Sequence, residues 1–347
     1  MPRSIVLLIH GMGSHPLDNM TREFKAGLQE AATGFGMDGF DPDEHMEIVE
    51  FNYSESLDSI RKKLASDAQD ILDMFPSGTP SSRIVDKLLK FQSNLSDDEF
   101  IYTHWLDVAL YCLFYGESIR VELAAKLNNL LKRAANRRVH VIAHSLGTAL
   151  LHDTLDKFYK VLGPGEADGD YPYLRAGGDN LKTIWTFANV SRLVNVLNNV
   201  AEVGPTVVRS GPTGCTDSFY NAYHEFDPFC WFEPFDDNSF PIESGRHFNT
   251  KIVRVKNTHS FQEYVSDPLV AKYLLAELAY AVEPLDPVNF DAYESSHKQN
   301  TPNEIYEKLK DKKEEIVAQK ISASSLKELF DLLSEFSDSI ENVWENT

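Results

Sequence analysis

Strand-like stretches and helical patterns alternate along most of this chain. The strand-like stretches begin at residues 4, 46, 139, 181, 218 and 251, and the last of them is KIVRVK (251–256). Continuous apolar runs, such as those at 4 and 139, suit strands that are buried on both faces of a parallel sheet. Between the strands, apolar residues recur at helical spacing. The alternation predicts an α/β fold with a mostly parallel sheet that is covered on both faces.

Two further regions predict helices without strands. The pattern over residues 55–136 is largely helical and stands directly before the strand at 139. Beyond residue 286 the composition turns polar and charged, and it predicts two amphipathic helices. We therefore expect one large α/β domain over residues 1–285, with a helical insertion at 55–136, and a helical C-terminal extension over residues 286–347.

Composition and charge exclude several classes of protein. The chain has 347 residues, of which 42% are hydrophobic, and this is enough for a full core. Its formal net charge of −20 argues against a nucleic-acid partner and against binding to anionic membranes, while contact with neutral lipid stays open. Neither a signal peptide nor a membrane-spanning run is recognisable, so we expect a cytoplasmic protein, at most peripheral to a membrane. Three cysteines without a CxxC pair fit a reducing compartment: Cys112, Cys215 and Cys230.

The segment VHVIAHSLGTALLHDTL (139–155) joins a strand to a helix through a serine, with few residues in which to turn. Small residues at Ala143 and Gly147 flank Ser145 where larger side chains would collide. This is the pattern of a nucleophile elbow, which exposes a serine Oγ at the N-terminus of a helix. The alternative is a serine that only caps the helix. The strand before it and the helix after it favour the nucleophile.

A serine nucleophile needs a histidine base and a carboxylate that orients the histidine. His259 follows the last predicted strand, and Asp227, with Pro228 after it, follows the strand before that. The order Ser145, Asp227, His259 is the one expected of an α/β-hydrolase. Three other acids are weaker candidates because none directly follows a strand: Asp217, Asp236 and Asp237.

The segment HGMG (10–13) follows the first strand and suits an oxyanion loop, because its glycines let the backbone approach a substrate. We expect the backbone amides of Met12 and Leu146 to stabilise the oxyanion. His10, Gly11 and His144 are expected to form the wall of the site.

No metal or cofactor is expected. His140 and His144 are four residues apart, but they lie on a strand and lack a third ligand. A core position for the first and a place in the site wall for the second fit this pattern better.

Three segments resemble the DDHD-domain family of intracellular phospholipases: the elbow with its preceding helix, NAYHEFDPFCWFEP (221–234) and THSFQEYVSD (258–267). The resemblance covers roughly residues 105–275. It implies an α/β-hydrolase fold and the release of one acyl chain from a glycerophospholipid. Asp227, His259 and Asp267 match three of the four name-giving positions of that family, while the elbow opens with Ala143 in place of the family's glycine.

These observations favour a serine carboxylester hydrolase, a lipase or esterase, that acts on a small-molecule or lipid ester through an acyl-enzyme. Aromatic residues of the insertion, such as Trp105 and Phe114, could line an acyl pocket or simply belong to the core. A thioesterase or an acyltransferase would use the same triad. A non-catalytic lipid-binding or scaffold protein of the same fold is the alternative from another class. The sequence leaves the oligomeric state open.

Overall fold

The computed structural model describes residues 4–11, 18–53, 116–160, 174–175, 181–197, 206–211, 214–231, 233–279, 287–299, 303–320 and 339. Several predicted features lie outside these residues. They are Met12, the insertion up to residue 115 with Trp105 and Phe114, and most of the chain beyond residue 320.

The described strands form one six-stranded sheet, in the order β2-β1-β3-β6-β7-β8, and a separate pair, β4-β5. Every pairing is parallel. The predicted α/β class with a parallel sheet is therefore confirmed. The strands are β1 (Ser4–Ile9), β2 (Met46–Phe51), β3 (Val139–His144), β4 (Tyr159–Lys160), β5 (Leu174–Arg175), β6 (Leu181–Phe187), β7 (Thr216–His224) and β8 (Gly245–Thr250).

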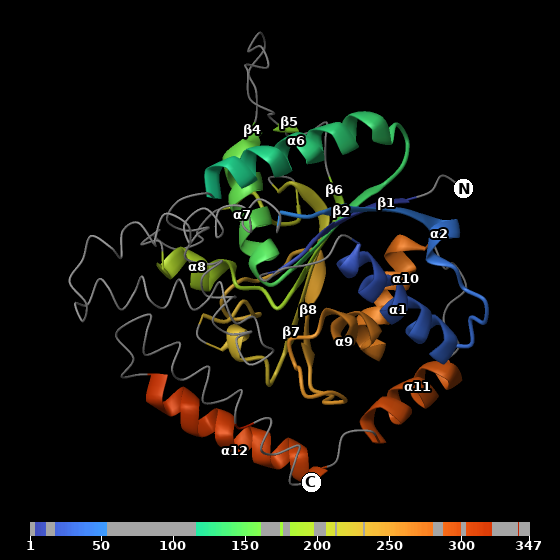
Figure 1. The fold of residues 1–347 in the computed structure, drawn as a ribbon, viewed down its shortest axis with the longest axis vertical. Coiled ribbons are helices and arrows are strands. Elements are labelled where there is room, and N and C mark those ends of the chain that lie inside the picture. The colour runs from blue at the N-terminus through green and yellow to red at the C-terminus, as the bar shows by residue number, and fades with distance from the viewer. Residues whose placement is uncertain are drawn as a thin grey trace, which may run out of the picture.

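Helices cover both faces of the six-stranded sheet, and Figure 1 shows α6 and α7 on one side and α1, α9 and α10 on the other. None of the described helices has the length and apolar sequence that a membrane span requires. The helices are α1 (Asn19–Gly34), α2 (Pro42–His45), α6 (Gly116–Ala134), α7 (Leu146–Phe158), α8 (Ser191–Leu197), α9 (Phe261–Ser266), α10 (Pro268–Leu278), α11 (Pro287–Gln299) and α12 (Asn303–Lys320), with a 3₁₀ turn, η3 (Pro228–Cys230).

The core lies in two layers because successive side chains of a strand point to opposite faces. Ile5, Leu7 and Ile9 of β1 join a cluster with residues of α6, α7 and α12. Val6 and Leu8 join a second cluster with residues of α1, α9, α10 and α11. The continuous apolar run of β1 is thus explained by burial on both sides.

The prediction of a strand over KIVRVK (251–256) is wrong. The edge strand β8 comes just before it and ends at Thr250, opposite the last residue of β7, His224. Beyond that point β7 turns away, so the chain has no strand left to pair with. Val253 is nevertheless buried in the core, and this burial explains the apolar composition of the segment.

Both described helices of the predicted C-terminal extension pack on the α/β unit. In α11, Tyr293 donates a hydrogen bond from its hydroxyl to the backbone oxygen of Ser266 (2.9 Å). In α12, Ile305, Leu309 and Ile316 are buried in the first core cluster. The domain boundary at residue 285 stays a prediction.

The strand order contains a switch point, between β1 and β3, at which a ligand could bind. From β1 the chain continues outward to β2 on one side, and then returns to β3 on the other side of β1. Parallel α/β sheets bind ligands outside the carboxyl ends of the strands at such a switch point. Gly11 follows β1 and Ser145 follows β3 at this point.

Candidate functional site

The β3–α7 turn holds Ser145 in a conformation that serine rarely adopts. Its φ of 54° and ψ of −127° lie outside the regions that are comfortable for a residue with a Cβ atom. Strained backbone of this kind gathers at functional sites, where the surrounding structure enforces it. The turn is enforced by close packing: a Cβ on Gly147 would lie 2.4 Å from the His10 backbone oxygen and 2.6 Å from that of Ile9.

The Ser145 side chain does not cap the helix. Although Ser145 precedes α7, its Oγ makes no capping hydrogen bond. Oγ is buried and has no hydrogen-bond partner among the residues that the structure describes. The capping alternative is therefore not what the structure contains. Ser145 directly precedes the first turn of α7, and the first amides of a helix have no carbonyl partner within it.

Gly11 brings the end of β1 against the elbow. A Cβ on Gly11 would lie 2.7 Å from the Cβ of Ser145 and 3.3 Å from His144 Nδ1. His10 is buried beside it, stacks on Tyr53 at 4.2 Å and accepts a hydrogen bond from the Tyr53 amide at Nε2 (3.0 Å). The three predicted wall residues, His10, Gly11 and His144, thus lie at the switch point. Leu146, one predicted oxyanion donor, is the first residue of α7.

Asp227 lies in the turn after β7 and is fully buried. Its Oδ1 accepts a hydrogen bond from the Phe229 amide at 3.1 Å, which starts the 3₁₀ turn at Pro228. Its Oδ2 accepts hydrogen bonds from His259 Nδ1 at 2.7 Å and from the Tyr264 hydroxyl at 2.8 Å. A carboxylate without solvent is stabilised in its charged form by such donors.

His259 lies in the loop between β8 and α9, where Asn257 Oδ1 accepts a hydrogen bond from its amide at 3.0 Å. Because Nδ1 faces the Asp227 carboxylate, it carries the proton, and Nε2 is left with a free lone pair. Nε2 is buried and without a hydrogen-bond partner among the described residues. The ring packs against Phe229 at 4.8 Å.

His144 links the serine to the histidine. It immediately precedes Ser145, and its ring lies 4.6 Å from the ring of His259. Its Nε2 donates a hydrogen bond to the backbone oxygen of His259 at 3.0 Å. Ser145 Oγ and His259 Nε2 are not hydrogen-bonded to each other, and neither has a hydrogen-bond partner in the part of the chain that the structure describes. Such contacts often tighten only when a substrate is bound.

The weaker acid candidates lie elsewhere. Asp217 is within β7, not before it, and pairs with Lys182 at 3.2 Å. Asp236 accepts hydrogen bonds from the Asn238 and Ser239 amides of its own turn. Asp237 is largely exposed. None of the three has a hydrogen bond or ion pair to His259 among the described contacts.

His140 and Asp267, two further residues with candidate chemistry, have structural contacts. His140 is buried in the sheet, where its Nδ1 lies 2.8 Å from Thr183 Oγ1, and burial lowers its pKa to about 3. Asp267 caps α10 by accepting hydrogen bonds from the amides of Leu269 and Val270. Among the described residues, no group of three or more His, Cys, Asp or Glu side chains is arranged to hold a metal ion.

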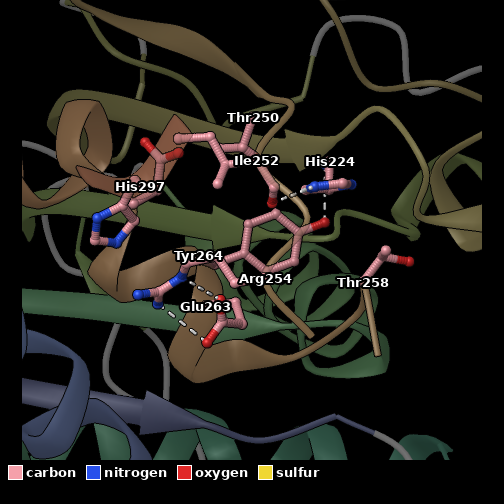
Figure 2. A pocket seen from close by; sticks show the side chains of 9 residues that line it. His224, Thr250, Ile252, Arg254, Thr258, Glu263, Tyr264 and His297 are labelled. Carbon is pink, nitrogen blue, oxygen red and sulfur yellow. Dashed lines mark hydrogen bonds and ion pairs between the residues drawn. The ribbon is translucent and has the colours of Figure 1, made fainter. Parts of the chain in front are cut away.

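The sequence did not indicate Tyr264, which bonds Asp227, or the His224 amide that bonds Tyr264. The Tyr264 hydroxyl accepts a hydrogen bond from the His224 amide at 2.9 Å and donates to Asp227. Figure 2 shows Tyr264 turned toward His224 at the wall of a pocket that also contains the paired Arg254 and Glu263. A tyrosine five residues after the histidine carries no signal in the sequence that would set it apart from a core residue.

Comparison of the chain with protein-family models gave no match, and neither did a search of curated proteins. Its function has therefore to be inferred from the arrangement of its side chains.

Proposed function

We propose that this chain is a serine carboxylester hydrolase of the α/β-hydrolase fold, with Ser145 as nucleophile, His259 as base and Asp227 as the orienting acid. The observation that carries the proposal is the 2.7 Å hydrogen bond between His259 Nδ1 and Asp227 Oδ2, together with an elbow serine whose Oγ has no hydrogen-bond partner among the described residues. These groups follow β3, β7 and β8, at one edge of a parallel sheet. They also occur in the chain order of α/β-hydrolases.

The reaction follows from these positions. His259 Nε2 takes the proton of Ser145 Oγ as Oγ bonds to the ester carbonyl carbon. The carbonyl oxygen becomes an oxyanion, for which we propose the Leu146 amide as one donor; Met12, the other predicted donor, lies outside the described residues. The tetrahedral intermediate then expels the alcohol, which receives the proton from His259. Water, activated by the same histidine, finally releases the acid and restores Ser145.

Labelling with a fluorophosphonate probe tests the nucleophile. Wild-type protein should be labelled at Ser145, and Ser145→Ala should not react. Ser191 is a matched control, because it is also buried at the start of a helix that follows a central strand, but its Oγ donates to Asn189 Oδ1 at 2.7 Å. Ser191→Ala should be labelled like wild type. A wild-type protein that does not react would favour the non-catalytic alternative.

For the substrate we propose an ester with an apolar acyl chain, such as a phospholipid or a neutral lipid. The support is the resemblance of the sequence and a net charge of −20, which disfavours strongly anionic surfaces. In a series of esters that differ only in acyl length, kcat/KM should rise about fourfold per buried methylene until the pocket is full. A flat profile would leave a hydrolase of small esters.

Thioesterase and acyltransferase activities remain the alternatives, because both pass through the same acyl-enzyme. Thioester analogues and added alcohol acceptors in the same assay separate them from ester hydrolysis. We also propose a reducing, cytoplasmic location with at most peripheral membrane contact. The free thiols of Cys215 and Cys230, both buried, are consistent with it.

A further inference from the structure

The buried carboxylate of Asp227 is held by a phenol as well as by the histidine. Its Oδ2 accepts from His259 Nδ1 at 2.7 Å and from the Tyr264 hydroxyl at 2.8 Å. The Tyr264 oxygen in turn accepts from the His224 amide at 2.9 Å. The result is a chain of donors, from a backbone amide through a phenol to the carboxylate, and each bond in such a chain polarises the next.

Tyr264 remains a donor at any pH at which a hydrolase would work. The phenol is buried, and burial together with the nearby Asp227 carboxylate raises the pKa of Tyr264 well above its ordinary value. Its proton therefore stays on the oxygen and points at Asp227. The thiol of Cys230 is kept neutral in the same way, since burial and Asp227 raise its pKa.

The backbone behind Tyr264 is fixed by His224. The His224 ring accepts from the Phe226 amide at Nδ1 (3.0 Å) and donates to the Ile252 backbone oxygen from Nε2 (3.1 Å). Burial lowers the pKa of His224, so the ring is neutral and this pattern is maintained. The turn that carries Asp227 is thereby tied to the segment that leads to His259.

The two donors to Asp227 Oδ2 also share one piece of chain. His259 stands two residues before α9, and Tyr264 is on α9 itself. The start of α9 and the two residues before it therefore connect the imidazole to the phenol. The phenol removes negative charge from the carboxylate oxygen that faces the imidazole.

We propose that Tyr264 is a positioning residue of the reaction proposed above, and that its hydrogen bond to Asp227 Oδ2 sets how strongly the Asp227–His259 pair holds an additional proton. The inference rests on the proposed function only for its catalytic readout. A donor to a carboxylate favours the ionised form and weakens its pull on a neighbouring proton. Loss of the phenol should therefore make the pair easier to protonate, whichever of the two residues carries the proton.

Other titratable groups lie around Tyr264 and around the Asp227–His259 pair. Burial raises the pKa of Asp267 to about 6 and lowers that of His297 to about 4, so both can titrate near the acid limb. Comparison with a matched variant removes their contribution. His144 from β3 contacts the His259 ring, and Cys230 from η3 lies near Asp227. A pocket beside Tyr264 is lined by His224 from β7, Arg254 after β8, Glu263 from α9, Asp267 before α10 and His297 from α11, while Glu225 and Lys313 of α12 act on His224.

The test is the pH dependence of kcat/KM for Tyr264→Phe. A hydrogen bond to a charged group is strong enough to move a titration by about one pH unit, so the midpoint of the acid limb should rise by about that amount. At the optimum pH, kcat should fall about tenfold, while KM should change less than twofold. Tyr293→Phe is the matched control: its hydroxyl is buried too, but donates to the Ser266 backbone oxygen. Its acid limb should coincide with that of wild type.

Two outcomes would overturn the proposal. One is an acid limb of Tyr264→Phe that coincides with that of wild type; the other is an equal shift in Tyr264→Phe and Tyr293→Phe. Should Tyr264→Phe fail to fold, 3-fluorotyrosine at position 264 keeps the packing and makes the phenol a stronger donor. The acid limb should then move to lower pH, and an unmoved limb would equally refute the role of Tyr264.

A measurement without turnover separates this inference from the proposed function. The pH midpoint of the His259 ring signals, followed by NMR, should rise in Tyr264→Phe even if the protein hydrolyses no ester. Absence of fluorophosphonate labelling in wild type would thus refute the hydrolase but not the role of Tyr264. An unchanged His259 midpoint would refute the role of Tyr264 but not the hydrolase.

Discussion

Replacing Ser145 by glycine should make the protein more stable while it destroys the proposed nucleophile. Two features of Ser145 cost stability in the folded state. Its backbone, at φ 54° and ψ −127°, is strained for any residue with a Cβ, at a cost of about 1–3 kcal/mol. Its buried Oγ has no partner among the described residues, and an unsatisfied buried hydroxyl costs about 1–3 kcal/mol.

Glycine removes both costs and adds one of its own. The greater freedom of a glycine in the unfolded chain costs about 0.5–1 kcal/mol. We therefore expect Ser145→Gly to raise the free energy of unfolding by about 3 kcal/mol. With an unfolding entropy of about 2.1 cal/mol/K per residue, a chain of 347 residues would then melt about 4 °C higher.

The assay is thermal and urea unfolding of three variants beside wild type. Ser145→Ala keeps the Cβ and hence the strain, so its gain should be smaller than that of glycine. Ser260 provides the control, because it precedes α9, makes no side-chain capping bond and has an ordinary φ of −64°. Ser260→Gly should lower the free energy of unfolding by about 0.5–1 kcal/mol. If Ser145→Gly melts no higher than Ser145→Ala, the elbow holds no backbone strain.

Three further predictions concern the acid, the elbow and the sheet. Asp227→Asn should lower kcat by three to four orders of magnitude, about the loss known for a triad whose histidine is held in the wrong tautomer, and Asp236→Asn should leave it within twofold; equal losses would refute the choice of acid. Gly147→Ala places a Cβ 2.4 Å from a backbone oxygen of the β1 end, so unfolding measurements should show a loss of about 1–3 kcal/mol, and an unchanged free energy of unfolding would contradict the close packing of the elbow. The pKa of His140 is lowered to about 3 by burial, so the unfolded state takes up a proton near pH 6.5 that the folded state refuses, and stability is lost as the pH falls from about 6.5 towards 3. His140→Gln should flatten this part of the profile in urea unfolding between pH 7 and 4, and an unchanged slope would contradict it.

The sequence was sufficient wherever the information is local. The apolar run of β1 predicts burial on both faces, because each of its side chains must find an apolar neighbour on one side or the other. Gly147 follows Ser145 by two residues because a side chain there would collide with the backbone of the adjacent strand. Asp227, followed by a proline, predicts the end of a strand. These features depend on a few consecutive residues, and the alternation of strands and helices then gives the fold class.

Tertiary pairing decided what the local pattern could not. The β-rich segment KIVRVK is not a strand, because a strand needs a partner and β7 ends opposite Thr250. Propensity measures how well side chains suit a sheet, but the extent of a strand depends on a neighbour that comes from elsewhere in the chain. Burial of Val253 accounts for the same apolar residues without any pairing.

In the candidate site, too, some features follow from the local sequence and others only from the tertiary structure. The sequence alone determined the order Ser145, Asp227, His259 and the strands that Ser145 and Asp227 follow. It placed His259 just after KIVRVK, which is not a strand, whereas His259 lies in the loop between β8 and α9. Only the tertiary structure decided that Asp227 meets His259 across 32 residues of sequence, and Tyr264 across 37. It also decided that Ser145 Oγ and His259 Nε2 are buried without a hydrogen-bond partner among the described residues, and that His144 bonds the backbone of His259, 115 residues away in the sequence. Hydrogen bonds of a few ångströms require relative positions that packing of the whole sheet and its helices sets, and no short stretch of sequence contains that information.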